Sequence, residues 1–97
     1  MHSGSMDNPG TKEGTLNALL LGCPSWPGYD AGDLEDAMRD NGARVTALST
    51  FISSLRIQYR AKLGIPKGGP NPIECNRLSD GAGNVLRYYR LAPFVRA

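Results

Sequence analysis

Short hydroxyl side chains and arginines are interleaved between residues 44 and 60, and these residue types are suited to binding an anionic polymer. A serine or threonine hydroxyl both donates and accepts hydrogen bonds, so it fits phosphate oxygens and base edges. An arginine guanidinium reaches a phosphate, or the edge of a guanine, through paired hydrogen bonds. The set comprises Arg44, Thr46, Ser49, Thr50, Ser53, Arg56 and Arg60. Its chemistry predicts contacts with double-stranded DNA.

Charge is divided unevenly along the chain. Residues 1–43 hold two cationic and seven anionic side chains, a net charge of −5, whereas residues 44–97 hold nine and two, a net charge of +7. No aspartate or glutamate occurs in the 30 positions from Arg44 to Ile73, where a carboxylate would repel a duplex. A basic half in a near-neutral chain indicates a localised anionic partner.

The same residues give no support for catalysis. The single histidine, His2, lies in a polar N-terminal tail, so serine, cysteine and aspartate nucleophiles lack a histidine base. The carboxylates gather in one early segment rather than forming a separated acid–base pair. The Gly68-Gly69 pair lacks the flanking residues of a phosphate loop. We therefore expect a protein that is not an enzyme and that binds no small-molecule cofactor.

Two cysteines, Cys23 and Cys75, are present. Neither has a second cysteine or a histidine at metal-ligand spacing, so no metal site is predicted. The chain shows no secretory signal pattern and no run of about 18 apolar residues, which predicts a cytoplasmic protein without membrane contact. In that reducing compartment we expect two free thiols, both buried as small hydrophobic side chains.

Two early helices are predicted from apolar periodicity. Leu16, Leu19 and Leu20 recur at helical spacing, in a helix that is capped by Thr11 or Thr15 and that stops near Gly22. A second stripe predicts a helix that is capped by an aspartate and ended by an Asn-Gly pair. The stripe consists of Leu34, Ala37 and Met38, the candidate caps are Asp30 and Asp33, and the stop is Asn41-Gly42.

A third and longer helix is predicted over about residues 45–62. Its apolar stripe consists of Val45, Leu48, Ile52, Leu55 and Tyr59. Gly64 and Pro66 end it. The hydroxyl groups and arginines occupy the opposite face, and a major groove about 12 Å wide admits one helix. This helix is therefore the expected recognition element.

Two strands, over residues 73–78 and 85–91, follow this helix and are joined by a Gly-rich hairpin loop. Arg77 and Arg87 on these strands are the predicted DNA contacts of the hairpin. Tyr88 and Tyr89 fall on opposite strand faces, so one is expected in the core and the other on the surface. Arg90 alternates with Tyr89 and Leu91 along the second strand, so it is a candidate for a structural role.

Two helices joined by a short turn, with a hairpin after the second, describe a winged helix-turn-helix. Three short motifs carry a resemblance to small winged helix-turn-helix proteins of phage and bacterial origin. They are Ile52-Ser53-Ser54-Leu55-Arg56, Ile73-Glu74-Cys75 and Tyr89-Arg90-Leu91. The resemblance spans Thr11 to Leu91, although the connectors at residues 22–32 and 64–72 are longer and richer in Pro and Gly. It implies an α+β fold with three helices followed by a two-stranded wing, and a DNA-binding role in transcription regulation or in phage DNA transactions.

The expected organisation is a disordered tail at residues 1–10, a winged helix-turn-helix domain at residues 11–92 and a C-terminal tail at residues 93–97. The residues ahead of Met6 are compatible with an expression scar. One such domain has a footprint on the order of 600–1,000 Å², so tight DNA sites usually require two copies. The sequence leaves the oligomeric state, monomer or homodimer, open.

Two alternatives stay open. Arg56 either contacts DNA or pairs with Glu35 or Asp36 of the second helix. The whole domain either binds DNA or serves as a protein–protein interaction module, because a fold does not fix a function.

Overall fold

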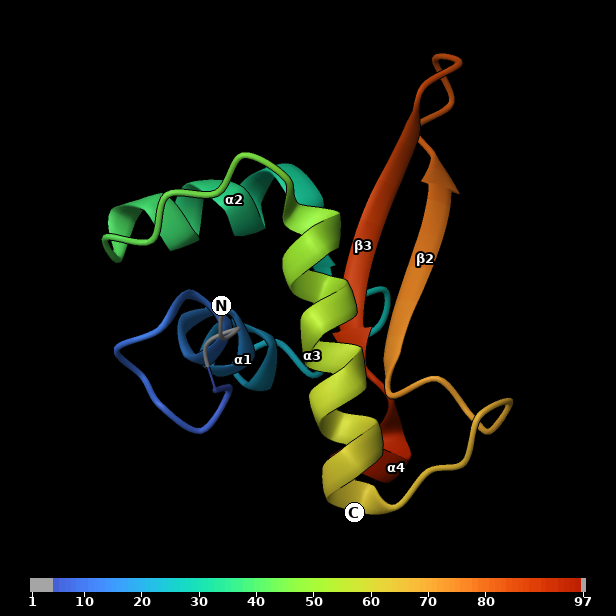
Figure 1. Ribbon diagram of the computed structural model, residues 1–97. Coiled ribbons are helices and arrows are strands. Elements are labelled where there is room, and N and C mark those ends of the chain that lie inside the picture. The colour runs from blue at the N-terminus through green and yellow to red at the C-terminus, as the bar shows by residue number, and fades with distance from the viewer. Residues whose placement is uncertain (1–4, 97) are drawn as a thin grey trace.

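The computed structural model describes residues 5–96, apart from the side chain of Arg96. This part of the chain contains four helices and one three-stranded antiparallel sheet (Figure 1). In chain order the elements are α1 (Lys12–Leu21), β1 (Tyr29–Asp30), α2 (Ala31–Asp40), α3 (Leu48–Leu63), β2 (Ile73–Ser79), β3 (Val85–Leu91) and α4 (Pro93–Arg96). The predictions made for residues 1–4 and 97 fall outside the described residues.

The predicted α+β class is confirmed, but the expected two-stranded sheet is wrong. Strand β1 lies in the Pro- and Gly-rich connector at residues 22–32, where no strand is predicted. It pairs with β3 through Tyr29–Tyr89 and Asp30–Tyr88, giving the order β1-β3-β2. Gly28 permits this pairing, because a Cβ atom there would lie 2.4 Å from the carbonyl oxygen of Tyr89. The C-terminal segment, expected as a tail, forms the short helix α4.

The helix ends follow the local signals in the sequence. The Thr11 hydroxyl accepts a hydrogen bond from the backbone N–H of Gly14 at 3.0 Å and so caps α1. The Asp30 carboxylate caps α2 by accepting from the N–H of Asp33 at 3.1 Å. Gly64 ends α3 in the left-handed conformation, with φ of 68°.

Helix α3 begins at Leu48, three residues later than the predicted start at residue 45. Residues 41–47 form a connecting loop that runs back along α2 to the start of α3 (Figure 1). Val45 packs against the core from this loop, so its place in the apolar spacing reflects burial rather than helical structure. As a result Arg44 and Thr46 precede α3 and are not part of it.

The core lies where the first three helices meet the base of the sheet. Its fully buried side chains are Leu16, Leu20, Leu34, Met38, Ile52, Leu55, Ile73 and Leu91. Tyr89 is buried and Tyr88 is half-buried, which agrees with the predicted opposite faces of β3.

The N-terminal segment is more closely attached to the fold than its composition suggested. The side chain of Met6 is only 5% exposed and belongs to the core cluster. Its backbone N–H donates to Oε1 of Gln58 on α3 at 2.7 Å. A single apolar residue therefore fixes this part of the segment that we had expected to be a disordered tail.

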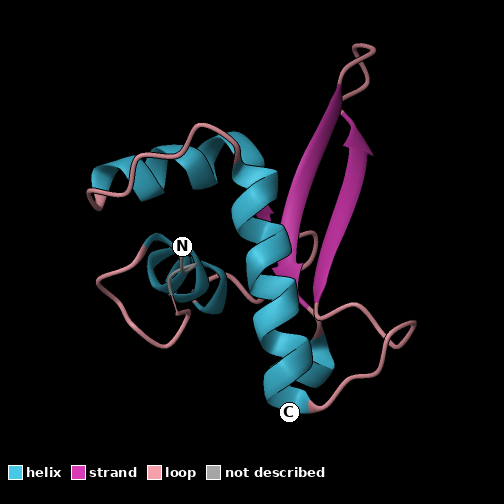
Figure 2. Ribbon diagram, viewed as in Figure 1, coloured by secondary structure: helices cyan, strands magenta, loops and turns pink. Residues whose placement is uncertain are grey.

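Strands β2 and β3 form a long hairpin that runs beside α3, and the hairpin loop projects beyond the N-terminal end of that helix (Figures 1 and 2). Within residues 5–96, none of the helices combines the length and apolarity that crossing a bilayer requires.

Candidate nucleic-acid interface

Arg77 and Arg87 are directly opposite each other on the hairpin. The register of β2 and β3 pairs Arg77 with Arg87 and, two positions nearer the core, Cys75 with Tyr89. Because strand side chains alternate, these residues share the sheet face that carries the buried Ile73 and faces the helices. Both arginines are exposed, and neither forms an ion pair with any of residues 5–96. Like charges at opposed positions are unfavourable unless an anion lies between them.

Helix α3 presents hydroxyl and arginine side chains next to this hairpin. Ser49, Ser53, Arg56 and Arg60 follow one another at spacings of four and three, which places them along one side of the helix. Arg56 fixes the direction of that side, because it contacts the first residue of β2. The helix therefore directs short polar groups toward the region beside Arg77 and Arg87.

The Arg56 side chain binds the protein's own backbone. Its Nε and Nη2 atoms donate to the carbonyl oxygen of Ile73 at 3.3 and 3.0 Å. The expectation that Arg56 pairs with Glu35 or Asp36 is wrong, since Asp36 bonds Arg39 at 2.7 Å and Arg56 is bound to β2. Arg56 thus positions the hairpin against α3.

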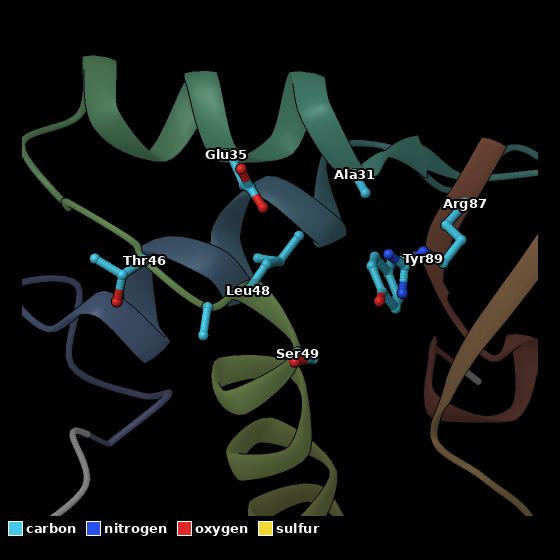
Figure 3. Close-up of a pocket in the computed structure, with 8 residues that line it drawn as sticks. Ala31, Glu35, Thr46, Leu48, Ser49, Arg87 and Tyr89 are labelled. Carbon is cyan, nitrogen blue, oxygen red and sulfur yellow. The ribbon is translucent and has the colours of Figure 1, made fainter.

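A small hollow lies between α2, the start of α3 and strand β3 (Figure 3). Its volume is about 130 Å³, which is below the roughly 300–1,000 Å³ typical of drug-sized ligand sites. Thr46, Ser49, Arg87 and Tyr89 line it, and the carboxylate of Glu35 points into it from α2 (Figure 3). The sequence did not predict that Glu35 lines a hollow, because α2 meets the start of α3 only through the path of the 41–47 loop, which runs back along α2 (Figure 1).

The outward stripe of α3 contains a residue that the sequence analysis did not single out. Ile57 lies two positions from both Leu55 and Tyr59, which are buried, so it falls on the opposite side of the helix. Thr50 and Ser53 lie on the same outward stripe and are exposed. The spacing of Ile57 from the buried stripe was the signal that could have identified it.

The remaining predicted site residues are distributed around this region. Arg44 and Thr46 are exposed on the 41–47 loop, ahead of α3. Arg60 is half-buried, and its Nε is enclosed without a hydrogen-bond partner among the described residues. Ser49 and Arg87 line the same hollow, Arg77 lies opposite Arg87 on the hairpin, and Ser53 lies one turn after Ser49 on α3. We call these four residues, together with Thr50, the basic face.

The carboxylates of the hairpin are occupied by internal partners. Arg90 donates from Nε to Oε2 of Glu74 at 2.7 Å, and this hydrogen bond lowers the pKa of the Glu74 carboxyl. The Asp80 carboxylate accepts from the backbone N–H of Ala82 at 2.8 Å and from the side chain of Asn84, which lowers the pKa of Asp80. Arg90 therefore has the structural role left open above, and the positive charge of Arg77 and Arg87 is not neutralised within the hairpin.

The cysteines differ in exposure. Both are free thiols, with Cys23 half-buried and Cys75 exposed. The expectation of a buried Cys75 is wrong, because the hairpin carries this residue past the edge of the core. Its cross-strand neighbour Tyr89 is still buried, and burial is the main cause that raises the pKa of the Tyr89 hydroxyl. Across residues 5–96, no three His, Cys, Asp or Glu side chains lie close enough together to hold a metal ion.

Comparisons with protein-family models, with curated proteins and with solved structures found no match to this chain.

Proposed function

We propose that this protein binds double-stranded DNA as a small winged helix-turn-helix regulator or phage-type DNA-binding factor. Helix α3 would occupy the major groove and the β2–β3 hairpin would contact the adjacent backbone. The observation that carries the proposal is the opposed pair Arg77 and Arg87, two exposed cations that form no ion pair with any of the described residues. A phosphate backbone would supply the missing negative charge.

The dimensions and surface of α3 are compatible with this role. Its 16 residues correspond to a length of about 24 Å, and a single helix fits the major groove. Ser49, Thr50 and Ser53 lie in its first two turns, where recognition helices contact base edges. Their short side chains allow the helix backbone to approach the bases closely. No carboxylate lies on α3 itself.

A protein–protein interaction module is the second candidate, because apolar side chains are exposed both on the β2–β3 hairpin and in the loop before β1. Val85 is 64% exposed at the start of β3, Leu86 follows it, and Trp26 is 60% exposed in the loop before β1. Such side chains are common at protein interfaces. They would equally serve a homodimer that binds DNA through two copies of the basic face.

Selection from a random duplex pool tests the proposal. The wild-type protein is expected to enrich one sequence, and Arg77→Ala together with Arg87→Ala should weaken binding to it at least tenfold. Arg39→Ala is the matched control, because Arg39 is an exposed arginine that pairs with Asp36 on the acidic helix α2. Equal losses for the control and the double variant would contradict the proposal. Failure of the folded protein to bind any duplex at low salt would favour the protein-interaction module.

A further inference from the structure

Ile57 is the most exposed large hydrophobic side chain in the described part of the chain. It is 66% exposed, although it lies in the middle of a helix whose other side is packed into the core. A β-branched residue also has a lower helix propensity than alanine or leucine. Neither packing nor helix formation therefore accounts for an isoleucine at this position.

The outward stripe of α3 on either side of Ile57 is small and uncharged. Ser53 and Ala61 lie one turn before and one turn after it, and Thr50 lies two turns before it on the same stripe. All three are exposed, and Ile57 is the largest side chain among them. A flat molecular surface that met this stripe would therefore touch Ile57 first.

We infer that the DNA site of this protein contains a thymine whose 5-methyl group packs against Ile57. The inference rests on the proposed function and specifies one base of its substrate. Thymine presents a methyl group in the major groove, and apolar side chains recognise it there. The absence of carboxylates from residues 44–73 and the position of Arg60 three residues after Ile57 favour a nucleic acid over an apolar protein surface.

Replacement of thymine by deoxyuridine tests this contact, because it removes the methyl group and leaves the Watson–Crick hydrogen bonds in place. The site selected from a random pool is remade with deoxyuridine at one thymine at a time, and affinity is measured by fluorescence anisotropy. For the wild-type protein we expect one position with a loss of about three- to fivefold, the effect of burying roughly one methyl group. For Ile57→Ala the loss at that position should disappear.

Leu63→Ala provides the matched control. Leu63 is an exposed apolar residue on the same helix but lies off the outward stripe, so this variant should keep the deoxyuridine loss. Circular dichroism should show unchanged thermal midpoints for Ile57→Ala, because a largely exposed side chain contributes little to folding.

The outcomes separate the inference from the proposed function. If the protein binds its selected duplex but every deoxyuridine substitution is neutral, or Ile57→Ala retains the same loss as the wild type, the thymine contact is refuted and DNA binding stands. A selected DNA site that contains no thymine would likewise refute the thymine contact and leave DNA binding standing. If no duplex binds, both the function and the contact are refuted.

Discussion

The guanidinium of Arg56 on α3 holds the first residue of β2, because its Nε and Nη2 atoms both donate to the carbonyl oxygen of Ile73. The two residues are 17 positions apart, and the long loop at residues 64–72 separates them. Ile73 is fully buried at the base of the hairpin. This contact therefore sets where the hairpin leaves the core, and with it the place of Arg77 and Arg87 relative to α3.

Arg56→Ala should destabilise the fold. It leaves the Ile73 carbonyl without its charged donor, and hydrogen bonds to charged groups contribute about 1.5–3 kcal/mol. We expect the free energy of unfolding in urea to fall by about this amount. Arg39→Ala should cost less than about 1 kcal/mol, because Arg39 forms only an exposed ion pair. A stability loss for Arg56→Ala no larger than that of the control would show that the contact does not anchor the hairpin.

Arg77→Ala should weaken DNA binding without weakening the fold. Removing one of two opposed cations relieves repulsion, so the unfolding free energy should stay within about 0.5 kcal/mol of wild type or rise slightly. The slope of log affinity against log salt should become shallower by about one, the effect of losing one phosphate contact. An unchanged slope would mean that Arg77 contacts no phosphate.

Leu55→Ala and Ser53→Ala should separate the two sides of α3. Leu55 is fully buried, so its truncation should cost about 2–5 kcal/mol of stability, as measured by chemical denaturation. Ser53 is exposed, so Ser53→Ala should leave stability unchanged and reduce affinity for the selected duplex. Unchanged affinity for Ser53→Ala, with the protein folded, would remove Ser53 from the basic face.

The ion pair between Glu74 and Arg90 should make stability depend on pH. The hydrogen bond from Arg90 lowers the pKa of Glu74 below the ordinary value of 4.5. A carboxyl with a lowered folded-state pKa stabilises the protein above its ordinary pKa, and this stabilisation is lost as the pH falls through the folded-state value. Glu74→Gln should therefore lower the thermal midpoint at pH 7, and the difference from wild type should shrink below about pH 4.5. A difference that stayed constant down to pH 2 would exclude this linkage.

Glu35→Gln should strengthen DNA binding. The Glu35 carboxylate points into the hollow that Arg87 and Ser49 also line, so it repels a phosphate approaching from that side. We expect a modest gain in affinity at low salt, on the order of twofold to fivefold, that fades as salt screens the repulsion. Weaker binding by Glu35→Gln would show that this carboxylate supports the site.

Local signals in the sequence predicted much of the helical structure. Thr11, Asp30 and Gly64 mark helix ends because each acts on backbone groups within a few residues. The buried stripe from Leu48 to Tyr59 was readable for the same reason. Val45 misled the prediction of the start of α3, because burial in a loop and burial on a helix look alike in a pattern of apolar spacing.

Features that depend on distant partners were not predictable. Strand β1 has two residues and exists only because Tyr29 and Asp30 meet β3 nearly 60 positions later. The contact between Arg56 and the Ile73 carbonyl was not predictable, because the loop at residues 64–72 separates the two residues along the chain. The five residues of the basic face were all singled out from the sequence, but the opposition of Arg77 and Arg87 required the hairpin register.

The salt dependence of duplex binding tests the central claim most directly. Affinity for a short duplex is measured by fluorescence anisotropy at about 50 mM and about 200 mM salt, with circular dichroism to verify folding. If α3 and the hairpin together contact three or more phosphates, affinity should fall about 40-fold or more between these concentrations. A folded protein whose affinity did not change with salt, or that bound no duplex at the lower concentration, would contradict the account.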